Sequence, residues 1–177
     1  NKVVSNIPYS ISSEITFKLL QHDFSLGILM YQKEFARRMT APTGTKDYSR
    51  LTVEVYYRAR CEILEEVPRR AFYPVPKVDS ALVRLTPRPP PFSLRDEATF
   101  HTLVRALFAH RRKKVSNALE LARGRFGLDK REVRDFVGGI RWKDLRAEDL
   151  EPEDFGELAN MLWELRERKR DRVAKRR

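Results

Sequence analysis

The sequence predicts an α/β fold, namely the C-terminal half of a doubly wound sheet, followed by a small all-helical domain. Short β-branched segments alternate with helical periods in the first half of the chain. A proline-rich run at residues 87–91 is stiff enough to act as a linker. Beyond it the apolar residues recur with the helical period alone. These three observations predict one domain over residues 1–90 and a second over residues 91–177.

The first domain is expected to contain two strand–helix units and then two closely spaced strands, an order typical of doubly wound sheets. The expected strands are residues 2–7, 25–32, 61–67 and 80–86. The expected helices are one that begins at Ser12 or Ser13, with that serine as its cap, and residues 33–39 and 49–59. Since the chain opens inside a strand and without an initiator Met, we expect the natural protein to extend further upstream.

The second domain is expected to hold four helices separated by glycine-containing turns. They are residues 96–109, 114–123, 130–137 and 152–168. Trp142 and Trp163 are expected in the core of this domain. Residues 164–177 carry eight basic and three acidic side chains. This basic tail is expected either to bind phosphate nonspecifically or to be a disordered, solvated end.

The composition favours a polyanionic partner and an intracellular setting. There are 36 Lys and Arg residues against 25 Asp and Glu, a net charge of +11. Nucleic acid is the commonest partner of so basic a chain, and a basic surface without a specific partner is the alternative. Cys61 is the only cysteine, no Cys/His cluster has metal-ligand spacing, and no apolar run could span a bilayer. We therefore expect a cytoplasmic protein without a metal or a membrane anchor.

The four residues Asn6-Ile7-Pro8-Tyr9, at the end of the first expected strand, have the chemistry needed to methylate an aromatic amine. The lone pair of such an amine is delocalised into the ring, so two acceptors must grip its hydrogens to turn the nitrogen toward a methyl donor. The Asn6 side chain can serve as one acceptor, and a backbone carbonyl made available by a rigid turn can serve as the other, since proline favours such a turn. The Tyr9 ring can stack on an extruded base. The alternative is an ordinary strand exit with Tyr9 as packing.

A second aromatic residue, Phe72, stands at the start of a proline-stiffened loop, residues 72–79. Its ring can cover the other face of a base held by Tyr9. The alternative is a hydrophobic plug over the sheet edge, which is the commoner role of a lone Phe. Phe72 is therefore a candidate for the same site.

Five motifs occur in order along nearly the whole chain. They are Asn6-Ile7-Pro8-Tyr9, Tyr31-Gln32-Lys33-Glu34, Tyr48-Ser49-Arg50-Leu51, residues 67–80 (Val-Pro-x-x-Ala-Phe-x-Pro-x-Pro-Lys-Val-Asp-Ser), and Arg111-Arg112-Lys113 with Asn117 and Leu119. This set resembles the KsgA-type ribosomal RNA adenine dimethyltransferases. The resemblance implies a Rossmann-like, S-adenosylmethionine-dependent methyltransferase domain and a small helical domain that faces rRNA. It also implies dimethylation of two adjacent adenines near the 3′ end of small-subunit rRNA, with a role in ribosome assembly.

The resemblance also implies roles for single residues. Asn6 would accept a hydrogen bond from the target amine and lie beside the donor methyl. Pro8 would offer its carbonyl, and Tyr9 and Phe72 would sandwich the adenine. Ile7 would shape the pocket next to S-adenosylmethionine. Catalysis would then consist mostly of positioning, because the sulfonium is a potent electrophile.

Basic residues supply the candidates for RNA contact. The run Arg111-Arg112-Lys113-Lys114 lies at a junction between two expected helices. By the resemblance it would face rRNA phosphates in a pre-ribosomal particle, with the protein acting as a monomer; a solvated helix end is the alternative. Lys33-Glu34 and Arg37-Arg38 can help to hold RNA, and a surface ion pair of Lys33 with Glu34 is the alternative.

One departure from the family pattern limits the expected activity. No G-x-G-x-x-G-like run occurs among the seven glycines. We therefore expect the chain alone to bind S-adenosylmethionine poorly and to be inactive. Two other functions stay open: a noncatalytic RNA-binding assembly factor with the same fold, and a resistance-type methyltransferase of large-subunit rRNA.

Overall fold

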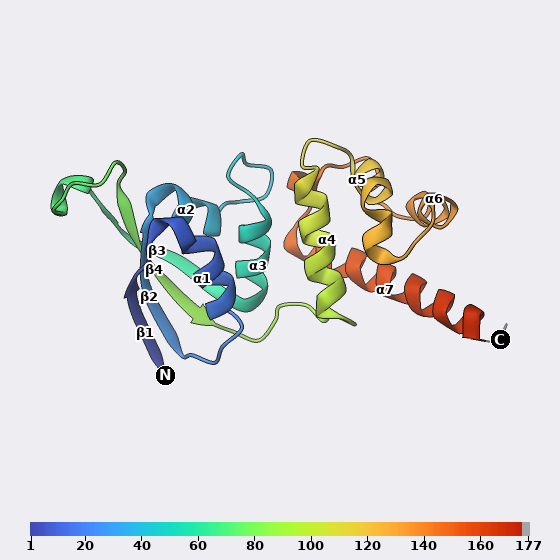
Figure 1. Cartoon of the computed structure of the whole chain (residues 1–177), viewed down its shortest axis with the longest axis horizontal. Helices are drawn as coiled ribbons and strands as arrows, with labels where there is room; N and C mark the ends of the chain where they lie inside the picture. The colour runs from blue at the N-terminus through green and yellow to red at the C-terminus, as the bar shows by residue number, and fades with distance from the viewer. Residues whose placement is uncertain (175–177) are drawn as a thin grey trace. The chain divides into compact units, whose positions relative to one another are not determined.

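A computed structural model describes residues 1–174, except the side chain of Val173. The backbone divides into two compact units, Asn1–Pro91 and a second that begins at Phe92 (Figure 1). The first unit is built around a sheet and the second is helical.

The first unit contains a four-stranded mixed sheet. Its strands are β1 (Lys2–Asn6), β2 (Leu26–Gln32), β3 (Ala59–Val67) and β4 (Ser80–Pro87). They lie in the order β1-β2-β4-β3, with β1 parallel to β2 and with β4 antiparallel to both of its neighbours. The carboxyl ends of β1, β2 and β3 therefore lie at the same edge of the sheet, together with the start of β4. Ligands of open α/β sheets bind beyond this edge.

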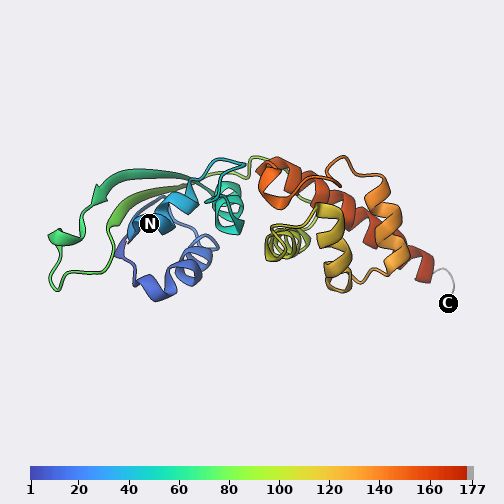
Figure 2. The same ribbon diagram turned by 90° about the horizontal axis from the view of Figure 1, so that it is seen from above.

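Three helices, α1 (Ser12–Leu19), α2 (Lys33–Met39) and α3 (Arg50–Arg58), cover one face of this sheet (Figure 2). The side chains that β2 and β4 direct to that face alternate with exposed or half-buried ones, as the two-residue period of a strand requires. Leu29 and Val83 are among the fully buried residues of the resulting core. The α/β, Rossmann-like fold class predicted from the sequence is confirmed.

A buried hydroxyl pair ties α1 to the sheet. Thr16 Oγ1 lies 2.8 Å from Tyr31 Oη, and both residues are fully buried. Burial raises the pKa of Tyr31 to about 12, so the phenol stays neutral and serves as a structural hydrogen-bonding group. The pair fixes α1 over β2 and thereby places the segment that joins β1 to α1.

The predicted serine cap of α1 is wrong. A 3-10 helix, η1 (Tyr9–Ile11), leads directly into α1, so Ile11 takes the cap position and no side chain caps the helix. Ser12 is buried, and its hydroxyl donates to the Pro8 carbonyl at 3.4 Å. The extra 3-10 turn is the physical reason, because it supplies main-chain partners where a serine cap would otherwise be needed.

The second unit consists of helices α4 (Glu97–Ala109), α5 (Val115–Ala122), α6 (Lys130–Gly138) and α7 (Pro152–Ala174). Two 3-10 helices, η3 (Arg123–Phe126) and η4 (Ala147–Asp149), join them. Asp96 caps α4 by accepting the Thr99 N–H at 2.7 Å. The core expectation holds for Trp142, which is 3% exposed, but Trp163 is only half-buried.

The last helix is longer than the sequence pattern predicts, because it continues from the expected end at residue 168 to Ala174. Most of the basic tail is therefore helical, and residues 175–177 of that tail lie outside the described residues. Within residues 1–174, no helix has both the length and the hydropathy needed to cross a membrane.

Candidate functional site

The segment after β1 carries the first candidate site. Asn6 is the last residue of β1 and is exposed at the carboxyl edge of the sheet. Ile7 is only 4% exposed and belongs to the core, and its N–H donates to the Met30 carbonyl at 3.1 Å. This bond extends the pairing with β2 one residue beyond the strand. Ile7 thus anchors the chain and leaves Asn6 and Pro8 at the surface.

A cavity of about 360 Å³ lies against this segment. Its volume is within the usual range of small-ligand sites. The structure brings five sequence-predicted residues from two distant segments to its wall. The lining residues are Asn6, Ile7, Pro8, Tyr9, Phe72, Tyr73, Pro74 and Pro76. We call this cavity the neutral pocket, because none of these residues is an acid, a lysine, an arginine or a histidine.

Two of the three aromatic residues of the neutral pocket, Tyr9 and Phe72, are held by opposite ends of the loop between β3 and β4. Tyr9 Oη lies 2.6 Å from Ser80 Oγ, at the start of β4. Phe72 directly follows a 3-10 helix, η2 (Arg69–Ala71), and its N–H donates to the Arg69 carbonyl at 3.3 Å. Both rings are half-buried and so keep surface for a ligand. The Tyr9–Ser80 bond was not predicted from the sequence.

The backbone carbonyls of two residues that line the neutral pocket, Ile7 and Pro8, differ in their availability. The Pro8 carbonyl accepts from the Ile11 N–H at 3.2 Å and from the Ser12 hydroxyl at 3.4 Å. A carbonyl oxygen has two lone pairs, so both are engaged, the second only by a long bond. For Ile7, no hydrogen bond to the carbonyl is found among residues 1–174. A donor that reaches the Ile7 carbonyl would therefore displace no existing hydrogen bond, whereas a donor to the Pro8 carbonyl would compete with Ser12.

The lining chemistry limits the reactions that the neutral pocket can support. The pocket offers amide, carbonyl and aromatic groups, and it offers no carboxylate or imidazole as a general base. In the part of the chain that the structure describes, no cluster of His, Cys, Asp and Glu could hold a metal. The single thiol, Cys61, is neutral because burial raises its pKa to about 12. Positioning and stacking are thus the means available here.

Asn6 and Ile7, the two residues predicted to contact a cofactor, differ in how accessible they are to a small ligand. Asn6 is exposed beside the neutral pocket, while Ile7 reaches the pocket wall from the core. An amide at the carboxyl end of a strand fits a ligand bound in the crevice beyond the sheet. The two residues therefore fit the edge of a cofactor site, and they hold no phosphate or ribose by themselves.

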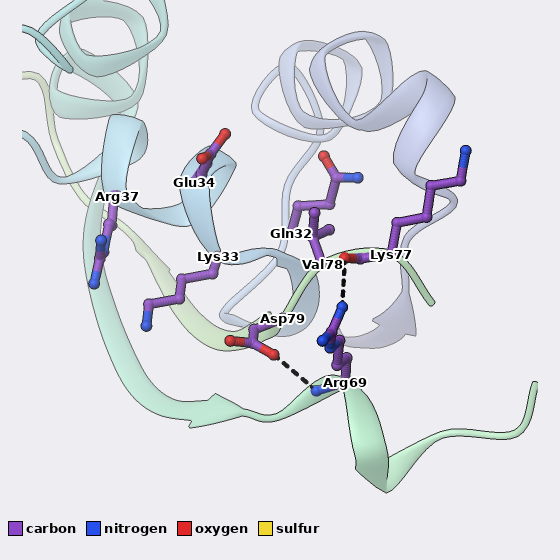
Figure 3. Close-up of a pocket in the computed structure, with 8 residues that line it drawn as sticks. All are labelled: Gln32, Lys33, Glu34, Arg37, Arg69, Lys77, Val78 and Asp79. Atoms are coloured by element: carbon purple, nitrogen blue, oxygen red, sulfur yellow. Dashed lines mark hydrogen bonds between the residues drawn. The ribbon is translucent and has the colours of Figure 1, made fainter. Parts of the chain in front are cut away.

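A second cavity, of about 440 Å³, follows β2 at the same edge of the sheet (Figure 3). We call it the charged pocket. It is lined by Gln32, Lys33, Glu34, Arg37, Arg69, Lys77, Val78 and Asp79. The sequence pointed to Lys33 and Arg37 and named Lys77 only as part of a motif. It did not mark Arg69, because the side chains of this pocket come together only through the β3–β4 loop.

The predicted basic run between α4 and α5 is divided by its ion pairs. Arg111 Nε donates to Glu148 at 2.7 Å, and Lys114 Nζ donates to Asp144 at 2.8 Å. The Lys114 hydrogen bond holds the pKa of Asp144 below its usual range. The intervening residues, Arg112 and Lys113, are exposed, and no ion pair of either is found in the described chain. The structure thus leaves two of the four predicted cations available to an anion.

Comparison with known proteins identifies relatives that match most of the length of this chain. The family model described as "Ribosomal RNA adenine dimethylase" matches residues 1–160. The "Probable ribosomal RNA small subunit methyltransferase A" of Methanosarcina acetivorans is 54% identical over 95% of this chain and 62% of that protein. A protein of the same name from Pyrococcus furiosus is 46% identical over 92% of this chain and 59% of that protein. The chain thus spans about three fifths of the length of these curated relatives.

Solved structures give the same picture. A dimethyladenosine transferase from Plasmodium falciparum matches with a TM-score of 0.76 at 29% identity, over 94% of this chain and 67% of that chain. The 23S rRNA methyltransferase ErmE matches with a TM-score of 0.59 at 30% identity, over 91% of this chain and 64% of that chain. Both are similar in fold and in sequence to the chain described here.

Proposed function

This chain belongs to the ribosomal RNA adenine dimethylase family, and we propose that the protein dimethylates the exocyclic amines of adjacent adenines near the 3′ end of small-subunit rRNA. The observation that carries the proposal is the neutral pocket. Four residues of one motif and Phe72 of another, more than sixty positions later, line a single cavity. An aromatic, uncharged cavity next to an exposed amide suits a neutral, planar base.

Each wall of the neutral pocket has a role in this reaction. Tyr9 and Phe72 hold the extruded adenine between their rings, and each base–aromatic contact is worth roughly 1–3 kcal/mol. Asn6 accepts one amine hydrogen through its side-chain carbonyl. The second acceptor is the Pro8 carbonyl once Ser12 releases it, or the Ile7 carbonyl, whose freedom from other bonds supports it.

The methyl donor that we propose is S-adenosylmethionine, whose sulfonium makes its methyl group electrophilic. In this chain Asn6 would face it, and Ile7 would shape the wall beside it. Because catalysis requires only that the amine be turned and desolvated, Asn6 is the catalytic residue and the aromatic rings orient the base. The amine proton leaves to water afterwards, which agrees with a pocket that lacks an acid or a base.

The second unit is the proposed rRNA-binding domain. Arg112 and Lys113 are the proposed phosphate contacts, because their charges are not neutralised by a neighbouring carboxylate. Arg111 and Lys114 hold the segment 143–148 in place through Glu148 and Asp144. Their contribution to RNA binding is therefore expected to be mainly structural.

The proposed setting is a pre-ribosomal particle in the cytoplasm, where the protein acts as a monomer in ribosome biogenesis. The names of the curated relatives support small-subunit rRNA as the substrate. Of the two solved structures compared above, the dimethyladenosine transferase has the higher TM-score, 0.76 against 0.59 for the 23S enzyme. We therefore favour the small-subunit reaction over a resistance-type reaction.

The 177-residue chain alone is expected to bind S-adenosylmethionine weakly and to be inactive. A glycine-rich loop at the start of a helix normally cradles the anionic or polar part of such a cofactor, and no such run is present in this sequence. Isothermal calorimetry on the isolated chain tests this. A dissociation constant in the low micromolar range would contradict the expectation.

The decisive experiment measures methyl transfer by the full-length protein to immature small ribosomal subunits. Asn6→Ala should lower the rate at least about 100-fold, the usual cost of removing one preorganised hydrogen-bonding group at a reacting centre. The matched control is Ser5→Ala, an exposed neighbour on the same strand, which should retain the wild-type rate. An Asn6→Ala protein as active as the control would refute the proposed role of the neutral pocket.

A further inference from the structure

The charged pocket lies next to the neutral pocket because the strands that precede them are paired in the sheet. The neutral pocket follows β1 and the charged pocket follows β2, and these two parallel strands are direct neighbours with Asn6 paired to Met30. Neighbouring strands lie about 4.8 Å apart. The β3–β4 loop borders both cavities, with Phe72 on one and Arg69 on the other. One ligand can therefore reach both cavities.

Two hydrogen bonds at the end of that loop hold the two cavities in a fixed relation. Tyr9 of the neutral pocket binds Ser80 through its hydroxyl at 2.6 Å. Asp79 directly precedes Ser80 in the chain, and its carbonyl accepts the backbone N–H of Lys33, in the charged pocket, at 3.0 Å. The Asp79 carboxylate in turn accepts the Arg69 N–H at 2.9 Å (Figure 3). The charged pocket is therefore a built site with fixed walls.

The side chains of the charged pocket favour an anion. Four of its lining residues are cations and two, Glu34 and Asp79, are carboxylates. In Figure 3 the Glu34 carboxylate points away from Lys33 and Arg37. The carboxylate of Asp79 is held by the backbone of the η2 turn.

Arg69 and Lys77 are the two cations of the charged pocket for which no ion pair is found in the described residues. The Lys77 side chain, however, extends away from Lys33 and Arg37 in Figure 3. The Arg69 guanidinium makes only a long bond, 3.5 Å, to the Lys77 carbonyl. Lys33 and Arg37 share a single carboxylate, that of Glu66, at 2.6 and 3.3 Å. Two positive charges thus meet one negative charge, and the excess is open to a further anion.

We propose that the charged pocket binds the backbone phosphate that flanks the extruded adenine, with Arg69 as its main ligand and with Lys33 and Arg37 as secondary ligands. The proposal rests on the proposed function, because a strand whose base enters the neutral pocket brings a phosphate of the same nucleotide or of its neighbour to this edge. Glu66 competes with that phosphate for Lys33 and Arg37. The subsite holds the strand in register while Asn6 acts on the amine.

The test measures the affinity of the full-length protein for an RNA hairpin whose loop holds two adjacent adenosines. Arg69→Ala should raise the dissociation constant about fivefold, as expected for one partly exposed charge pair. Arg70→Ala is the matched control, because Arg70 is exposed in the same turn but lines neither pocket. It should change the constant by less than twofold.

A charge-neutralising variant, tested beside its own control, should change the affinity for RNA in the opposite direction. Such an increase excludes unfolding as the cause. Glu66→Gln removes the competitor of the phosphate and should tighten binding, by about twofold to fivefold. Glu62→Gln, on the same strand, is the control, because Glu62 pairs with Arg60 and Arg84 outside the pocket. It should leave the affinity unchanged.

A hairpin with a neutral methylphosphonate at a linkage flanking the target adenosine identifies the ligand as a strand phosphate. The wild-type protein should bind this RNA more weakly than the unmodified hairpin. The Arg69→Ala protein should bind the two RNAs with nearly the same affinity, because it already lacks the main ligand of that phosphate. Equal losses for Arg69→Ala and Arg70→Ala, or an Arg69→Ala effect that is the same on both RNAs, would overturn the subsite and leave the proposed reaction standing. Wild type that binds neither RNA would count against both.

Discussion

The neutral and charged pockets share one sheet edge and one loop, yet their lining chemistry differs, and we propose that they hold different parts of a nucleotide. The neutral pocket offers stacking and hydrogen-bond acceptors, which can select a base. The charged pocket offers mainly cations, which can position a backbone but cannot read a base. If the proposed roles hold, catalysis and strand positioning depend on separate cavities, and mutations in one cavity should leave the function of the other intact.

The largest expected effect in this comparison comes from Phe72. Phe72→Ala removes one face of the stacking site. It should lower kcat/KM for methyl transfer by about 5-fold to 150-fold, which corresponds to a loss of roughly 1–3 kcal/mol of transition-state stabilisation. Phe72→Tyr keeps a ring and should restore most of the activity. The salt dependence of RNA binding should stay the same, since stacking releases no counterions. A shallower salt slope in Phe72→Ala would break the division between the two pockets.

A smaller effect is expected from the bond that joins the neutral pocket to the loop. Tyr9→Phe keeps the stacking ring but leaves the fully buried Ser80 hydroxyl without this partner. The free energy of unfolding should fall by about 1 kcal/mol in urea titration. Ser80→Ala combined with Tyr9→Phe should cost less than the sum of the two single changes. Strict additivity would show that the bond does not hold the loop.

The smallest effect is the titration of Glu66. The hydrogen bond from Lys33 is the main cause that holds the pKa of Glu66 below its usual range, followed by the charge of Lys33 and by Arg37. A depressed carboxyl pKa contributes stability above the unfolded pKa, and this contribution is lost as the pH falls through the folded pKa. NMR titration should show a lowered midpoint that moves up in Lys33→Ala. An unchanged midpoint would remove Glu66 as the partner of Lys33.

Much of the fold follows from local pattern. The bounds of α2 agree with the sequence prediction, because a periodic helix directly follows a buried strand. The predicted strands agree with β1 to β4 to within two residues. The cap of α1 and the end of α7 differ, because helix ends depend on the partners that the rest of the fold supplies.

The residues of the candidate site were likewise only partly predictable from the sequence. Contiguous motifs are visible in a sequence, so Asn6, Tyr9 and Phe72 could be named in advance, and their roles remain predictions until they are tested. Arg69 carried no local signal, and Lys77 was named only as a motif residue without a role. Their place beside Lys33 results from the pairing of β2, β3 and β4, which brings the β3–β4 loop to the end of β2.

The sequence by itself determined the residue chemistry of this protein: its charge, its strand and helix periods, and an amide, a proline and aromatic rings in ordered motifs. Only the tertiary structure decided which groups are available. It engaged the Pro8 carbonyl in a turn, neutralised Arg111 and Lys114, and left Arg69 open. The physical reason is that availability depends on neighbours in space, and those are set by strand pairing and packing over long sequence separations.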